Sequence, residues 1–293
     1  MRIIVTGGSG FIGSHLVKFL LKKKHHVLNI DKLSKYSVNE SLNKIKNNKY
    51  YTFEKIDLQN FNKLNSIIIK YKPETIFNLA AESHVDRSIK NPINFVKSNI
   101  NSTINLLESS RKLLNLNKNL TKKFKFIHVS TDEIYGSLKR NNKKFTEKSQ
   151  IDPSSPYASS KASTDLLVKS WIRTYKLPAI ITNCSNNFGP WQYPEKLIPV
   201  IISKALKKED IPIYGNGKNI RDWIFVLDHI EVLYLIFKKG KIGESYNIGT
   251  NNEFENIKIC KKICSHLNYL TKNVFDYTKL INFVPDRKGH DLR

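Results

Sequence analysis

The sequence predicts an α/β fold in which a doubly wound parallel sheet is joined to a second, smaller lobe of mixed α/β structure. Short apolar stretches alternate with amphipathic ones through about residue 183, a pattern typical of strands and helices that wind into a parallel sheet. After Cys184 this alternation ends, and short segments punctuated by Gly and Pro follow. We therefore expect a domain over residues 1–183 and a lobe over residues 184–293, with segments around 220–250 as candidates to return to the first domain.

A glycine-rich segment follows the first predicted strand, residues 2–6, and opens a predicted amphipathic helix over residues 11–23. Two overlapping spacings are present, G-x-G-x-x-G from Gly8 and G-x-x-G-x-x-G from Gly7. Small residues let the backbone approach a diphosphate, whose charge is met by the helix N-terminus. With a strand before it and a helix after it, the segment predicts a Rossmann-type dinucleotide site. Its candidate cofactor contacts are Gly7, Gly10, Phe11, Ile12 and Gly13.

An acidic residue stands where a dinucleotide site requires one. Asp31 follows the predicted strand over residues 26–30 and lies 18 residues after Gly13. A carboxylate there accepts hydrogen bonds from the adenosine ribose hydroxyls and repels a 2′-phosphate, so NAD is expected over NADP. The positive charges of Lys32 and Lys35 act against this preference. The alternative for Asp31 is a helix-capping or surface role.

Two further predicted strands, residues 50–56 and 75–79, end in residues suited to a bound cofactor. Ligands bind at the carboxyl ends of strands in an open α/β sheet. We expect the residues after the first of these strands to reach the adenine edge, and the small residues after the second to let a flat cofactor lie close. The candidates are Asp57, Leu58, Leu79, Ala80 and Ala81.

Three polar residues beyond the fourth predicted strand are candidates to contact the substrate. Ser83 and His84 follow its carboxyl end, which favours a substrate contact for His84 over a surface position. Asn99 lies within a predicted helix over residues 91–117 that has Pro92 in its first turn. A mid-helix asparagine competes with backbone hydrogen bonds, so it is either tolerated on the surface or turned inward for a purpose. The sequence does not decide between these two positions.

A catalytic group is predicted between residues 126 and 161. Thr131, Asp132 and Glu133 fall at the carboxyl end of an apolar run, and Tyr157 and Lys161 stand four residues apart on one helix face. A free phenol titrates near pH ~10, so its use as a base near neutrality requires a pKa about three units lower. An adjacent lysine cation and an oxidised nicotinamide both act in that direction. A packed tyrosine beside a surface lysine is the alternative.

Composition narrows the class of protein. The net charge of +24 suggests nucleic acid, but the lysines are spread over every predicted helix and loop, which favours a solvated surface. Of three cysteines, Cys260 and Cys264 stand at helical spacing among apolar residues and are expected to be core thiols, with no metal site. No apolar run reaches the roughly 18 residues of a membrane span, and the start does not resemble a signal peptide. We expect a cytoplasmic enzyme.

The chain resembles the extended short-chain dehydrogenase/reductase superfamily and, within it, the dTDP-glucose 4,6-dehydratase family. The resemblance covers nearly the whole length and rests on the segments TGGSGFIGS, LAAESHVDRSI, VSTDEIYG, SPYASSKAS, NCSNNFGPWQYPEKLIP, YGNGKNIRDWIFVLDH, YNIGT and VPDRKGHDLR. The glycine loop and Tyr-x-x-x-Lys mark only the superfamily. The Thr-Asp-Glu triplet is far more specific to the dehydratases.

The resemblance implies a reaction in which a sugar is oxidised only transiently. Tyr157 would take the proton of the 4-hydroxyl while hydride passes from C4 to NAD. Glu133 would remove the C5 proton as protonated Asp132 donates to the departing 6-hydroxyl, and hydride would return to C6. Thr131 would bond the 4-oxygen, and Lys161 would hold the nicotinamide ribose. Adjacent strand residues point apart, so both acids reach the sugar only if the chain bends, with Gly136 as a candidate aid.

The resemblance also implies binding residues and an assembly. The nucleoside-diphosphate part of the sugar substrate would contact Asn186, Lys196, Leu197, Pro212, Tyr214, Arg221, Asn256, Arg287 and His290. Asn187 and Lys32 would lie near the cofactor. The helices over residues 91–117 and 157–176 would form the interface of a homodimer, with no membrane or nucleic acid as partner.

Two departures from the family and several alternatives remain. The family's run after Asp31 is replaced by Lys-Leu-Ser-Lys-Tyr-Ser, and the chain ends at Arg293, so we expect the lobe to lack the family's final helix. UDP-glucose is an alternative substrate, because a single methyl group on a base changes the binding free energy by only about 1–3 kcal/mol. A nucleotide-sugar 4-epimerase would not need Asp132 and Glu133. A non-catalytic NAD-binding protein would not need Tyr157 and Lys161, and a nucleic-acid-binding protein would bind DNA in a salt-sensitive way.

Overall fold

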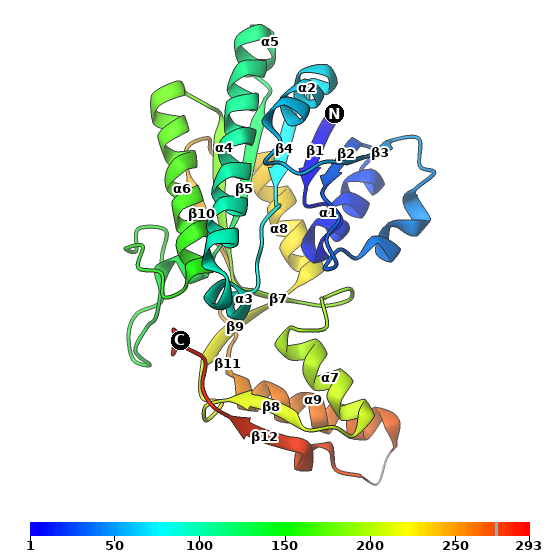
Figure 1. The fold of residues 1–293 in the computed structure, drawn as a ribbon, viewed down its shortest axis with the longest axis vertical. Coiled ribbons are helices and arrows are strands. Elements are labelled where there is room, and N and C mark those ends of the chain that lie inside the picture. The colour runs from blue at the N-terminus through cyan, green and yellow to red at the C-terminus, as the bar shows by residue number, and fades with distance from the viewer. Residues whose placement is uncertain (273–274) are drawn as a thin grey trace.

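A seven-stranded parallel sheet with helices on both faces dominates the computed structural model, which describes residues 1–272 and 275–293 (Figure 1). The strand order is β10-β6-β5-β4-β1-β2-β3. The bounds of these strands are β1 Arg2–Thr6, β2 His26–Asp31, β3 Tyr51–Lys55, β4 Thr75–Asn78, β5 Lys125–Thr131, β6 Ala179–Cys184 and β10 Ser245–Ile248. The predicted Rossmann-type fold class is confirmed.

The helices divide between the two faces of this sheet. Helices α1 (Phe11–Lys22) and α8 (Val226–Lys239) pack on one face, and α2 (Phe61–Tyr71), α4 (Pro92–Leu116) and α6 (Pro156–Tyr175) pack on the other (Figure 1). Shorter helical segments complete this part of the chain: η1 Asn39–Ile45, α3 Val85–Lys90, α5 Lys118–Thr121 and η2 Asp132–Tyr135. No helix in the described ranges is long and apolar enough to cross a membrane.

The strands are continuous apolar runs because both of their faces are buried. In β1, Ile3, Ile4 and Val5 are all fully buried. Ile3 and Val5 belong to the core under α1 and α8, whereas Ile4 belongs to the core under α2 and α4. This alternation fixes the register of the central strand, because a slip of one residue would exchange the two sets.

The smaller lobe is built on two short sheets below the carboxyl ends of the large one (Figure 1). Strands β7 (Asn186–Phe188), β9 (Ile220–Phe225) and β11 (Glu253–Glu255) form one, and β8 (Ile211–Tyr214) pairs with β12 (Ile281–Val284) in the other. Helices α7 (Leu197–Lys207) and α9 (Asn256–Thr271) and the turn η3 (Tyr277–Leu280) cover them. The core of the lobe includes Cys260 and Cys264, both fully buried.

The chain returns from the lobe to the large sheet before it ends. Strand β10 pairs in parallel with β6, with Ser245 opposite Ile181, and α8 packs beside α1. The large sheet therefore receives a strand from beyond residue 184. The domain boundary placed at residue 183 stays a prediction.

Candidate active site

A cavity of about 380 Å³ opens at the carboxyl ends of the central strands and reaches the start of the lobe. This volume lies in the range of ligand sites, roughly 300–1,000 Å³. Residues from many separate segments line it, and most residues proposed from the sequence are among them: Gly7, Gly10, Phe11, Ile12, Gly13, Asp31, Lys32, Asp57, Leu58, Leu79, Ala80, Ala81, Ser83, Thr131, Asp132, Glu133, Tyr157, Lys161, Asn186, Asn187, Lys196 and Leu197.

The remaining residues proposed as substrate contacts do not line this cavity. They are His84, Asn99, Pro212, Tyr214, Arg221, Asn256, Arg287 and His290. His84 caps α3, where its Nδ1 accepts from Arg87 N at 3.4 Å. Asn99 is turned inward, because its amide accepts from the backbone N–H of Glu82 and donates to Ser160 Oγ. Their roles in substrate binding stay predictions.

The glycine loop is shaped for close backbone approach at one set of glycines. Gly7 has φ +68°, and a Cβ on Gly13 would lie 2.1 Å from the carbonyl oxygen of Gly7. Gly8 does not line the cavity, so the Gly7, Gly10 and Gly13 series faces it. Helix α1 begins after Gly10 without a side-chain cap, which leaves its first N–H groups for a ligand. The loop fits a dinucleotide diphosphate.

Asp31 lies at the end of β2 and is held by the backbone. Its two oxygens accept from Ser9 N at 3.1 Å and Leu33 N at 2.9 Å. Burial raises the pKa of Asp31, while these two hydrogen bonds and Lys32 act in the opposite direction. Lys32 Nζ is 2.9 Å from Glu82 Oε1, so its charge is already paired. The arrangement suits ribose hydroxyls better than a 2′-phosphate.

The chain turns sharply where the two candidate acids stand. Asp132 and Glu133 begin η2, and the Thr131 side chain caps this turn by accepting from Glu133 N at 3.3 Å. The change of direction occurs at Thr131, directly before the two acids. Gly136, with φ +78°, ends the turn. The bend that both acids require is therefore present.

The two acids have different electrostatic surroundings. Burial, and then the charge of Glu133, raise the pKa of Asp132 to about 7, against the opposing effect of Arg221. Burial also raises the pKa of Glu133, but three cations oppose it there, namely Lys196, Arg221 and Arg287. Near neutral pH, Asp132 is thus able to hold a proton that it can donate. Unequal surroundings of this kind separate the roles of two neighbouring carboxyl groups.

Tyr157 and Lys161 lie on the buried face of α6 and both line the cavity. The pKa of Tyr157 is raised well above its ordinary value by burial and then by Glu133, while a hydrogen bond to Thr131 acts in the opposite direction. This direction is opposite to the lowering expected from Lys161. The Lys161 ammonium donates instead to the carbonyl oxygen of Val129 at 2.9 Å. The structure therefore places the pair together without activating the phenol.

Basic residues of the lobe gather near Glu133. Lys196 Nζ donates to the carbonyl oxygen of Ser83 at 3.1 Å, which joins the lobe to the segment after β4. Arg287 Nε lies 3.7 Å from Asp86 Oδ1, and Tyr214 OH donates to the other oxygen of Asp86 at 3.3 Å. The lobe thus contacts α3 on the opposite side of the cavity opening.

Several cavity residues were not proposed from the sequence. Ser130 Oγ, Ser185 Oγ and Trp223 Nε1 line the cavity and are buried without a hydrogen-bond partner among the described residues. Such groups are expected where a polar ligand binds. No local signal marks Trp223, because its place depends on the return of β9 to the site. Ser130 was at least marked by its place at the end of β5.

A second group missed from the sequence closes the adenosine side of the cavity. The guanidinium of Arg87 lies 3.5 Å from the centre of the Tyr36 ring, and its Nη2 is 2.8 Å from Glu195 Oε1. Tyr36 also packs edge-on against Tyr193. Tyr36 belongs to the run after Asp31 that departs from the family. This departure was the only feature of the sequence that marked Tyr36.

The glycine loop, the acid at the end of β2 and the Tyr-x-x-x-Lys pair in one cavity define an extended short-chain dehydrogenase/reductase. Comparison with known proteins narrows this class. The sequence model of the GDP-mannose 4,6 dehydratase family matches residues 4–292. The dTDP-glucose 4,6-dehydratase of Haemophilus influenzae is 48% identical over 300 residues, which cover 100% of this chain and 88% of that protein.

Solved structures agree. The dTDP-glucose 4,6-dehydratase of Streptomyces venezuelae, solved with NAD, has a TM-score of 0.91 at 36% identity, covering 100% of this chain and 87% of that one. A UDP-glucose 4-epimerase of Thermotoga maritima has a TM-score of 0.85 at 31% identity, with 100% and 88% covered. The chain belongs to the GDP-mannose 4,6 dehydratase family and, within it, to the dTDP-glucose 4,6-dehydratases. The resemblance found in the sequence is confirmed.

Proposed function

We propose that this chain converts dTDP-glucose to the 4-keto-6-deoxy sugar with NAD as its cofactor. The observation that carries the proposal is the presence of Thr131, Asp132, Glu133 and Tyr157 in one cavity, with the two acids in unequal surroundings. A 4-epimerase has no water to eliminate and no use for such a pair. Net loss of water follows from oxidation at C4, elimination across C5 and C6, and addition of hydride at C6 with a proton at C5.

The residues that would hold NAD are those of the glycine loop, Asp31, and the strand ends at Asp57 and Ala80. When bound, NAD accepts hydride from the sugar and gives it back, so it is regenerated in each cycle. The pairing of Lys32 with Glu82 removes a free cation beside Asp31, which favours NAD over NADP.

Tyr157 would take the proton of the sugar 4-hydroxyl, and Thr131 would hold the same oxygen. The Thr131 side chain lies close enough to Tyr157 to oppose the rise in the pKa of the phenol. A 4-hydroxyl placed between them would be held by both. The 4-ketone that results makes the C5 hydrogen acidic, which prepares the elimination.

Glu133 would take the C5 proton while Asp132 gives its proton to the departing 6-hydroxyl. A pKa of about 7 lets Asp132 carry that proton near neutrality. Lys196, Arg221 and Arg287 favour the charged form of Glu133, as a base requires. The same three cations would meet the diphosphate of the nucleotide, where Arg offers two parallel donors.

The test is to incubate the purified protein with dTDP-glucose and, separately, with UDP-glucose, and to follow the sugar by proton NMR. We expect a 6-methyl doublet from the product of dTDP-glucose. The kcat/KM for dTDP-glucose should be greater than that for UDP-glucose. The Glu133→Gln variant should bind the substrate and fail to form the methyl group. A product epimerised at C4, or full turnover by Glu133→Gln, would contradict the proposal.

The same reasoning extends to assembly. Exposed apolar side chains lie on α4 and α6, including Leu116, Leu166 and Tyr175, and these helices would pair with their copies in a homodimer. Sedimentation velocity should show a dimer that Leu166→Lys weakens. Three free, buried cysteines are in keeping with a cytoplasmic enzyme. We propose no nucleic-acid partner, because the lysines of this chain are dispersed along the sequence.

A further inference from the structure

Two opposite charges are buried together below the active site. Within residues 1–272 and 275–293, Lys161 and Asp165 are the only Asp, Glu, Lys or Arg residues that are buried, with exposed fractions of 4% and 1%. They stand four residues apart on the buried face of α6, and Tyr157 stands four residues before Lys161. Residues at this spacing are neighbours on a helix surface. Tyr157, Lys161 and Asp165 thus form one stripe that runs from the cavity into the core.

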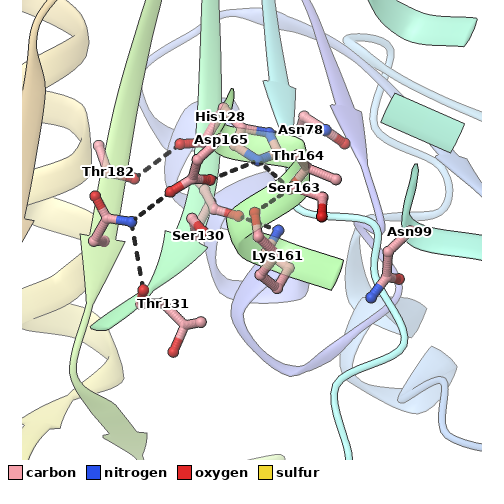
Figure 2. Close-up of polar contacts among 12 residues, drawn as sticks. Asn78, Asn99, His128, Ser130, Thr131, Lys161, Ser163, Thr164, Asp165 and Thr182 are labelled. Carbon is pink, nitrogen blue, oxygen red and sulfur yellow. Dashed lines mark hydrogen bonds and ion pairs between the residues drawn. The ribbon is translucent and has the colours of Figure 1, made fainter. Parts of the chain in front are cut away.

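The carboxylate of Asp165 is held from two neighbouring strands. Its Oδ1 lies 3.3 Å from Nε2 of His128 on β5, and its Oδ2 accepts from Nδ2 of Asn183 on β6 at 2.8 Å. Asn183 also donates to the carbonyl oxygen of Thr131 at 3.4 Å. Figure 2 shows Asp165 beside His128, with Lys161 on the same helix and Thr131 at the end of the strand. Asp165 therefore links the stripe on α6 to the strand end that carries the candidate acids.

A chain of hydrogen bonds fixes the protonation of His128. Thr6 Oγ1 donates to Asn78 Oδ1 at 2.8 Å, so the Asn78 amide nitrogen faces Nδ1 of His128 and donates to it at 3.1 Å. The ring proton of neutral His128 is then on Nε2, which donates to Thr164 Oγ1 at 3.0 Å, while Asp165 Oδ1 lies 3.3 Å away without a hydrogen-bond partner among the described residues. Burial, and then the charge of Lys161, lower the pKa of His128 and keep it neutral. His128 therefore lies beside Asp165 without cancelling its charge.

Lys161 and Asp165 form no direct ion pair, so the negative charge of Asp165 acts on Lys161 through space. The titratable groups that influence Lys161 are Asp165 on its own helix, Cys184 at the end of β6 and His128 on β5. Cys184 is a protonated thiol at neutral pH, because burial raises its pKa to about 12. Burial lowers the pKa of Lys161, and Asp165 acts against that lowering. A buried ion of one sign is stable only with a partner of the other sign.

We propose that Asp165 is a positioning residue that supplies the counter-charge of Lys161 and, through Asn183, aligns the Tyr157–Lys161 pair with the Thr131 strand end. This inference rests on the proposed function, because it assigns Asp165 to the support of the oxidation at C4. Asp165 touches neither substrate nor cofactor. Its effect on the reaction passes entirely through Lys161 and through the strand ends that it joins.

The first test is a double-mutant cycle on stability, which does not depend on any substrate. Asp165→Asn leaves Lys161 as an unpaired buried cation, so we expect its urea midpoint to fall well below that of the parent protein. Lys161→Met combined with Asp165→Asn removes both charges, and we expect the midpoint to recover part of the loss. Asp228→Asn, on the exposed face of α8, is the matched control and should leave the midpoint unchanged.

The outcome of this cycle separates charge pairing from simple packing. Additive losses in the double variant would overturn the proposal, because Asp165 would then stabilise the fold independently of Lys161. If Asp165→Asn alone does not fold, a folded double variant supports the proposal and an unfolded one overturns it.

The second test follows the oxidation at C4 alone. In an Asp132→Asn, Glu133→Gln parent, elimination is blocked, so mixing with dTDP-glucose should produce the near-ultraviolet absorbance of reduced nicotinamide. Adding Asp165→Asn should move the alkaline limb of the pH profile of this absorbance to lower pH by about one unit, because Lys161 then loses its proton more readily. No absorbance in the parent would contradict the proposed function, whereas an unmoved limb in the triple variant would contradict the role of Asp165.

Discussion

The two halves of the active site are built in different ways. On the side of the large sheet, the polar groups of the cofactor half are held by the protein itself, as Asp31 is by Ser9 and Leu33 and Lys32 is by Glu82. On the lobe side, Trp223 Nε1, Asn256 Oδ1 and Asp291 Oδ1 are buried without a hydrogen-bond partner in the described part of the chain. Unpaired buried groups cost about 1–3 kcal/mol each.

The two halves therefore differ in how many of their polar groups have partners before a ligand binds. Apart from Ser130 Oγ, the cofactor half has the hydrogen bonds described above and its glycine shape in place. The lobe half brings three cations near one carboxylate and leaves polar atoms without partners, as expected where a charged ligand supplies the missing contacts. The cofactor half should therefore respond to substitutions mainly in chemistry and retention of NAD, and the lobe half mainly in affinity for the sugar nucleotide.

The largest effect is expected from Tyr157→Phe, which removes the phenol and keeps the ring packed against Val85 and Phe95. General-base catalysis contributes typically 10²–10⁴-fold, so turnover of dTDP-glucose should fall about 10³-fold. Steady-state assays of the 4-keto product measure this, with bound NAD checked by absorbance. Tyr71→Phe is the matched control, since the Tyr71 hydroxyl donates to His26 O, away from the cavity, and activity should be kept. If turnover by Tyr157→Phe fell less than tenfold, Tyr157 would not be the general base.

Next in size is the pH dependence of stability produced by Asp132. Its folded-state pKa of about 7 is above the ordinary value of 3.8, so the folded protein binds more protons than the unfolded chain between these pH values. The contribution of Asp132 to stability is therefore lost as pH rises from about 4 to about 7. Relative to the parent, Asp132→Asn should gain about 2–4 kcal/mol in the free energy of unfolding between pH 4 and pH 8. Urea unfolding at both pH values measures this, and a pH-independent difference would show that Asp132 is not perturbed.

A smaller effect, confined to the lobe half, is expected from Arg221→Gln. Removing a charged donor costs roughly 1.5–3 kcal/mol, so KM for dTDP-glucose should rise about 10- to 100-fold with NAD content unchanged. The pKa of Asp132 should also rise further, because Arg221 favours its charged form. Arg140→Gln, whose guanidinium pairs with Glu255 at the surface, is the control and should leave KM as it is. Loss of NAD from Arg221→Gln would contradict the separation of the two halves.

The smallest effect concerns cofactor choice. Glu82→Gln should release Lys32 to meet a 2′-phosphate, so the affinity for NADP relative to NAD should rise a few-fold at low salt. The gain should disappear at high ionic strength, since exposed charges are screened. Competition binding measures the ratio of the NADP and NAD affinities. Glu209 pairs with Lys204 of α7, so Glu209→Gln is the control and should not change this ratio.

The cofactor half could be predicted from sequence because it is encoded in short consecutive segments. The glycine loop, Asp31 and the strand ends each lie within a few residues of a recognisable strand, and parallel strands bring their carboxyl ends to one edge. The lobe half depends on how distant segments return to the site, so Trp223 gave no local signal. Its named residues came from the resemblance to a family and not from spacing.

The burial of Asp165 and the turn at Thr131 could not be predicted from the sequence. Asp165 follows Lys161 at the spacing of an ordinary surface ion pair, and only its burial shows that the pair is internal. Gly136 was predicted to aid the turn and does end it, but the turn begins at Thr131, whose side chain caps it before the acids. In both cases the sequence showed which side chains were present, whereas it did not show how they were oriented relative to the core.

The most direct test of the proposed reaction is the fate of the hydrogen at C4. The purified protein would be given dTDP-glucose labelled with deuterium at C4, and the product would be analysed by NMR and mass spectrometry. We predict that the deuterium appears in the 6-methyl group, while C5 gains a solvent hydrogen. Deuterium lost to solvent, or a sugar that keeps its label at C4, would contradict transient oxidation at C4 coupled to elimination across C5 and C6.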